Sequence, residues 1–191
     1  MNDLVVVNTS STMLFVSWQP VVPLQRNGPI LSYNVYYQQA PNQPRAPASS
    51  PCVSSSCVVT VVAPSTSTPL TMLDKYVEYI VYVTASTMIG EGPASNSETL
   101  LTSPDVPAGT VQNIGALSES STSIILQWDP PLITLQNGPI EGYMISWTRI
   151  SSAYANPSRL STFAVPSSAL LVGLVNITDV ATSSYEVTGL P

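Results

Sequence analysis

Short runs with a two-residue period of apolar positions mark the first half of the chain. Residues 32 to 38 (SYNVYYQ) place Tyr33, Val35 and Tyr37 on one face, and residues 79 to 85 (YIVYVTA) alternate in the same way. This period is typical of strands with one buried face. We also predict strands at residues 12–18, 58–62 and 97–102. No segment has the sustained 3.6-residue period of a substantial helix.

The chain repeats itself after 110 residues. WQPVVPLQRNGPILSY at residues 18–33 aligns without a gap with WDPPLITLQNGPIEGY at residues 128–143, and the offset is 128 − 18 = 110. A repeat of domain length favours tandem domains over a solenoid or propeller. We therefore predict two domains, residues 1–103 and residues 104–191. Their junction, SPDVPAG, contains two prolines and is too short to be a flexible tether.

Composition agrees with an all-β fold. Of the 191 residues, 44% are apolar, which is enough to build cores. The 18 prolines and 9 glycines, with many Ser, Thr and Val residues, favour short strands joined by turns.

An ordered series of residues in each repeat resembles fibronectin type III domains. The first repeat contains Trp18, Asn27-Gly28, Tyr33, Leu73 and Tyr79, and Tyr79 begins the motif Y-x-V-x-V-x-A-x-x-x-x-G-x-G-x-x-S. The second repeat contains Trp128, Asn137-Gly138, Tyr143, Tyr185 and Leu190. The resemblance implies two immunoglobulin-like Greek-key β-sandwiches in tandem. It also implies that the second sandwich lacks its last two strands in this chain, whereas the first is nearly complete.

Most of these residues are expected to be structural. Aromatic and leucine side chains of the series are predicted core anchors: Trp18, Tyr33, Leu73, Tyr79, Trp128, Tyr143 and Leu190. The resemblance assigns Tyr79 to the tyrosine corner, in which the hydroxyl is hydrogen-bonded. The two Asn-Gly pairs are typical of turns with positive φ, so we assign them no binding role.

This sequence lacks the residue patterns that catalysis requires. The chain contains no His, which removes the commonest general base and metal ligand. Its two cysteines cannot form a four-thiolate zinc site. The carboxylates form neither a calcium-loop ladder nor an evident acid–base pair, and no serine lies in a G-x-S-x-G or S-x-x-K setting. We expect no enzyme activity, no metal and no cofactor.

The charge distribution excludes some partners. The formal net charge is −6, and the five basic residues are scattered singly: Arg26, Arg45, Lys75, Arg149 and Arg159. No surface could therefore neutralise a series of phosphates, so nucleic acid and anionic membrane are poor partners. No stretch is long enough to span a bilayer. The expected partners are a protein ligand or neighbouring repeats.

Two features favour an extracellular setting. Cys52 and Cys57 are separated by four residues, so a local disulfide is sterically feasible, the alternative being two unpaired thiols on a loop. Asn8-Thr9-Ser10 and Asn176-Ile177-Thr178 satisfy the glycosylation sequon. The chain begins without a secretory signal, which we interpret as a truncated start.

The resemblance implies a non-catalytic extracellular spacer, adhesion or protein-binding module within a larger multi-repeat protein. Receptor-type tyrosine phosphatases and usherin-like and sidekick-like cell-surface proteins are built in this way. Two alternatives remain open: accessory domains of a secreted microbial polysaccharide-degrading enzyme, and an intracellular cytoskeletal module. The loop at residues 87–92 contains no Arg-Gly-Asp. The sequence therefore lacks the residues for the integrin-binding mode that uses this motif.

Overall fold

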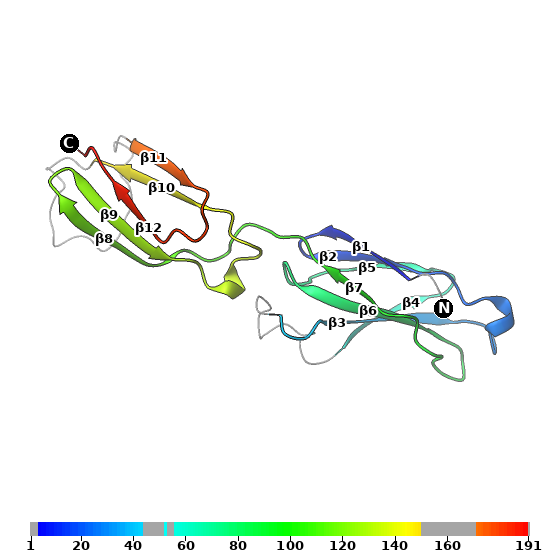
Figure 1. The fold of residues 1–191 in the computed structure, drawn as a ribbon. Coiled ribbons are helices and arrows are strands. Elements are labelled where there is room, and N and C mark those ends of the chain that lie inside the picture. Colours follow the sequence, from blue (N-terminus) through cyan, green and yellow to red (C-terminus); the bar gives the residue numbers. More distant parts are fainter. Residues whose placement is uncertain (1–3, 44–51, 53–55, 150–170, 191) are drawn as a thin grey trace, which may run out of the picture. The chain divides into compact units, whose positions relative to one another are not determined.

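The computed structural model describes residues 4–43, 52, 56–149 and 171–190 (Figure 1). Two compact units make up the chain. Unit 1 comprises Met1–Gln112 with Pro130–Pro139, and unit 2 comprises Asn113–Asp129 with Ile140–Pro191. Among the described residues, no helix has the length and apolar character needed to cross a membrane.

In its described residues, unit 1 contains seven antiparallel strands in two sheets. One sheet has the order β1-β2-β5, with β1 at Val5–Ser10, β2 at Met13–Ser17 and β5 at Ser67–Leu70. The other has the order β4-β3-β6-β7, with β4 at Cys57–Val62, β3 at Ser32–Gln39, β6 at Glu78–Ser86 and β7 at Glu98–Leu101. This arrangement confirms the predicted all-β sandwich.

The core of unit 1 follows from strand alternation. Every second side chain of β3 and β6 faces inward, and Val35, Val81 and Val83 are fully buried there. Leu14 and Val16 of β2 cover them from the other sheet. The predicted anchors Trp18, Tyr33, Leu73 and Tyr79 are also buried.

The described part of unit 2 contains five strands, which are equivalent to the first five of unit 1. The sheet β8-β9-β12 is formed by Gln112–Ser120, Ser123–Asp129 and Ser184–Val187, and β10 (Tyr143–Thr148) pairs with β11 (Leu171–Ile177). Trp128 is buried, whereas Tyr143 and Leu190 are half-buried. In the described part of unit 2, no strand pairs with the other edge of β10, whereas β3 pairs with both β4 and β6.

Matched contacts show that the two repeats use one framework. The amide of Leu73 donates to the carbonyl oxygen of Thr12 at 3.1 Å, and the amide of Leu190 donates to that of Thr122 at 2.9 Å. The Thr offset is 110, whereas the Leu offset is 190 − 73 = 117. Seven additional residues therefore lie between the matched strands of unit 2.

The aromatic anchors and turns repeat as well. The Trp18 and Tyr33 ring centroids lie 5.3 Å apart, and those of Trp128 and Tyr143 lie 5.4 Å apart. Gly28 and Gly138 have φ values of 158° and 151°. Positive φ in these turns is what the two Asn-Gly pairs predict.

Candidate protein-interaction site

The tyrosine corner sets the start of β6. The Tyr79 hydroxyl accepts a hydrogen bond from the Asp74 amide at 2.9 Å and donates to Oδ2 of Asp74 at 3.3 Å. Gln39 also donates to Oδ2 of Asp74, at 2.6 Å. Burial raises the pKa of Tyr79 above its ordinary value. The corner thereby fixes the strand whose far end carries the loop 87–93.

A groove of about 620 Å³ lies between that loop and the loop preceding β3. Apolar lining comes from Val21, Ile30 and Ile89, and the Ile89 side chain is 90% exposed. Arg26 is the basic residue of the lining, and its Nε donates to the carbonyl oxygen of Val21 at 2.6 Å. A concave surface with exposed apolar and few polar groups is suited to binding a ligand.

Backbone hydrogen bonds hold the loop 87–93 in place. The Thr87 amide donates to the carbonyl oxygen of Gly90 at 2.9 Å, and the Gly92 amide donates to that of Ala85 at 2.9 Å. The groove is therefore bounded by an ordered turn, which reduces the entropy lost on binding.

Glu91 of this turn lies over the outer face of the adjacent sheet. Its Oε1 accepts hydrogen bonds from Nδ2 of Asn34 at 3.1 Å and from the Thr84 hydroxyl, and its Oε2 accepts one from the Tyr36 hydroxyl at 3.1 Å. The donors, first Thr84 and then Asn34, lower the pKa of Glu91. The carboxylate is therefore both charged and held in position.

Tyr36 also stacks on Tyr82, with ring centroids 5.0 Å apart and planes 13° apart. We call this part of the sheet the tyrosine face. It consists of Asn34, Tyr36, Thr60, Tyr82, Thr84 and Glu91. The alternation at residues 79–85 sets Tyr82 and Thr84 on the face of the strand opposite Tyr79, but nothing in the sequence indicates that Glu91 lies over them.

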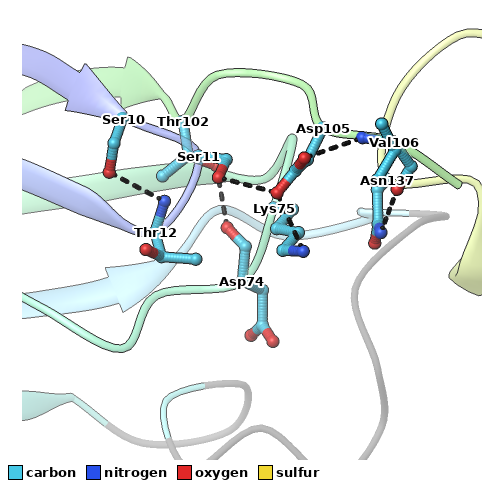
Figure 2. Close-up of polar contacts among 9 residues, drawn as sticks. All are labelled: Ser10, Ser11, Thr12, Asp74, Lys75, Thr102, Asp105, Val106 and Asn137. Carbon is cyan, nitrogen blue, oxygen red and sulfur yellow. Dashed lines mark hydrogen bonds and ion pairs between the residues drawn. The ribbon is translucent and has the colours of Figure 1, made fainter. Parts of the chain in front are cut away.

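A second polar cluster holds residues 105 and 106 (Figure 2). Oδ2 of Asp105 lies 2.9 Å from Nζ of Lys75 and accepts a hydrogen bond from the Ser11 hydroxyl at 3.1 Å. Oδ1 of Asp105 accepts one from the Val106 amide at 2.8 Å. Asn137, in the loop that groups with unit 1, donates from Nδ2 to the Val106 carbonyl oxygen at 2.7 Å. These contacts fasten the start of the predicted junction to unit 1.

Asp105 is expected to make stability depend on pH. Lys75, followed by the Val106 amide, lowers the pKa of Asp105 in the folded chain. The contribution of Asp105 to folding stability is therefore present above the pKa of an unfolded Asp, about 3.9. It is lost as the pH falls through the lower pKa of the folded chain. In urea unfolding at pH 7, Asp105→Asn should lower the midpoint, and this difference should vanish near pH 2. Glu98→Gln is the matched control, and an equal loss in that variant would contradict the pairing.

The predicted disulfide is present in the structure between Cys52 and Cys57. The two predicted sequons differ in their surroundings. Asn8 is half-buried, and its Nδ2 donates to the Leu101 carbonyl oxygen at 2.8 Å. Asn176 is exposed on β11. Among the described residues, no group of three His, Cys, Asp or Glu side chains could hold a metal ion.

Comparison with known proteins agrees with this architecture. The family model of the fibronectin type III domain matches this chain twice, at residues 2–100 and at residues 109–191. The chain belongs to the fibronectin type III family. Its two domain matches correspond to the two repeats of the sequence.

Relatives of these fibronectin type III domains are cell-surface proteins. The chain is 32% identical to receptor-type tyrosine-protein phosphatase F of Danio rerio, over 78% of its own length. It is 34% identical to tyrosine-protein phosphatase Lar of Drosophila melanogaster over 75% of its length, and 35% identical to protein sidekick-1 of Gallus gallus over 74%. The chain spans only 6% to 7% of the length of these curated relatives.

Proposed function

We propose that this chain is a non-catalytic extracellular module that spaces domains and binds a protein ligand, within a larger cell-surface or matrix protein. One observation carries the proposal. The similarity to receptor-type phosphatases and sidekick-1 extends over about three quarters of the chain and through both repeats. These relatives support a cell-surface setting for the module.

The groove of unit 1 supports a binding role. It is formed by two loops at one end of a rigid sandwich, which is the usual place for function in such folds. Exposed Ile89 and partly exposed Val21 and Ile30 supply apolar area, and Arg26 supplies a polar group. An exposed apolar side chain between polar groups is suited to act as an anchor for a protein ligand.

The disulfide and one sequon support the extracellular setting. A disulfide persists in oxidising compartments and is rare in the cytosol. Cys52 and Cys57 are bonded, and the exposed Asn176 lies in a sequon. Asn8 is the weaker acceptor, because a glycan on its Nδ2 would displace the hydrogen bond to Leu101.

Secretion from mammalian cells should therefore yield a glycosylated, thiol-free protein. With a signal peptide added, the chain should lose mass on treatment with peptide N-glycosidase and show no free thiol under denaturing conditions. Asn176→Gln should remove most of this glycan, whereas Asn8→Gln should remove little. Intact-mass measurement and thiol titration before and after reduction check both expectations. Two titratable thiols together with an absence of glycan would contradict the extracellular setting.

A further inference from the structure

The tyrosine face is an organised surface that shares only Glu91 with the groove. Its central residues lie on β3 and β6, and Asn34 pairs with Thr84 and Tyr36 with Tyr82 in the register of these strands. Tyr36 and Tyr82 are half-buried, so parts of both rings reach solvent. Val58 on the neighbouring β4 is 52% exposed and adds apolar area. Tyrosine presents large contact area at a low cost in conformational entropy.

Glu91 keeps unused acceptor capacity on this surface. An ionised carboxylate offers about four lone-pair sites. Among the described residues, Asn34 and Thr84 donate to Oε1, but only Tyr36 donates to Oε2. A further donor can therefore approach Oε2 from solvent without displacing an existing hydrogen bond.

The charge of the face indicates the complementary group. The four strands of this sheet, β3, β4, β6 and β7, contain no Lys or Arg, whereas Glu78 and Glu98 lie on β6 and β7. Lys75 pairs with Asp105, and Arg26 donates to the Val21 carbonyl oxygen. In the described part of unit 1, no cation is bonded to Glu91, so its charge is available to a partner.

We propose that the tyrosine face docks a protein partner by taking up an arginine side chain, which stacks on the Tyr36–Tyr82 pair and donates to Oε2 of Glu91. A guanidinium is planar and weakly hydrated, so it can lie on an aromatic ring and direct an N–H group at a carboxylate together. An ammonium is a compact, strongly hydrated charge and fits this combination less well. The inference rests on the proposed protein-binding function and adds the chemistry of the partner at a second surface.

A peptide titration followed by NMR tests the docking. Acetyl-Gly-Arg-Gly-amide is added to the full chain labelled with ¹⁵N, and amide shifts are recorded. We expect saturable shifts at Asn34, Tyr36, Tyr82 and Glu91. The same peptide with citrulline, which keeps the shape but lacks the charge, should give no saturable shift. The lysine peptide should bind more weakly than the arginine peptide.

Matched variants separate the two contacts. Glu91→Gln is expected to weaken arginine-peptide binding by about two- to fivefold through loss of an exposed ion pair. Tyr82→Leu should weaken it by about two- to fivefold through loss of the ring, while Tyr82→Phe should keep it. Glu98→Gln removes one charge from the same sheet and should change affinity by less than about 1.5-fold, because screened charges act weakly at a distance. Retained shift dispersion shows that each variant is folded.

Several results would overturn the proposal. Equal weakening by Glu98→Gln would indicate general attraction of cations, and equal binding of the lysine peptide would remove the stacking argument. Saturable shifts of the same amides with a neutral trisaccharide, but not with the arginine peptide, would make the face a carbohydrate surface. Shifts that appear on concentrating the chain alone would identify a second copy as the occupant. None of these results bears on secretion or thiol content, which test the proposed function separately.

Discussion

Residues 104–191 produced alone are expected to self-associate, whereas residues 1–103 produced alone are expected to stay folded and monomeric. We propose these boundaries for the two domains. The difference arises at β10, which pairs with β11 on one side and with no described strand on the other. An unpaired strand edge presents backbone donors and acceptors that can pair with another molecule.

Apolar side chains in the interior of unit 2 also favour self-association. A cavity of about 230 Å³ opens between its sheets and is lined mainly by apolar side chains: Ile124, Leu126, Trp147, Val187 and Leu190. In unit 1, β6 covers the equivalent position and buries Val81 and Val83. Apolar surface without such a cover favours association in water.

Analytical ultracentrifugation and hydrogen exchange test whether residues 104–191 self-associate. Sedimentation of residues 104–191 should depend on concentration, and that of residues 1–103 should not. In the monomeric fraction, the amides of Tyr143–Thr148 should exchange rapidly relative to those of β3. Strong protection of Tyr143–Thr148 in a monomeric sample would show that the second domain closes by itself and would refute the proposal.

Tyr79→Phe should lower the free energy of unfolding of unit 1 by about 1 to 3 kcal/mol. The variant keeps the ring and removes a hydroxyl that is hydrogen-bonded to Asp74 at both the amide and the carboxylate. The Asp74 amide would then lose its partner in a protected environment, and an unsatisfied polar group is costly. Tyr79 is 1% exposed, so water cannot easily replace the hydroxyl.

Urea unfolding of the full chain, followed through amide signals of β3 and β6, measures the loss within unit 1. Tyr36→Phe is the matched control, because it removes a hydroxyl from the same sheet but on the exposed tyrosine face. The control should shift the midpoint less than Tyr79→Phe. Equal midpoints for the wild type and Tyr79→Phe would place the corner on a different tyrosine.

Repetition made much of the fold predictable. The alternation in β3 and β6 and the 110-residue offset identify strands, turns and domain number from sequence alone. Two strands of unit 1 escaped prediction for local reasons. β5 contains Pro69, a residue that weakens a strand prediction. β1 is an edge strand that pairs only with β2, and its alternate side chains are half-buried rather than buried.

The candidate sites were less predictable than the fold. Glu91 and Asn34 are 57 positions apart in the sequence, and Ser11 and Asp105 are 94 apart. Such pairs depend on how strands are placed in register, and no local pattern encodes their meeting. The disulfide was predictable because its cysteines are only five positions apart.

The shared framework of the two repeats also affects how the chain reaches its folded state. Leu73 and Leu190 form the same backbone hydrogen bond with equivalent threonines, and both Trp–Tyr pairs have nearly the same spacing. During refolding, the strand that leads to Leu73 or Leu190 can therefore pair with either of two similar strands, one in its own repeat and one in the neighbouring repeat. Cross-pairing of this kind is the characteristic error of adjacent similar domains.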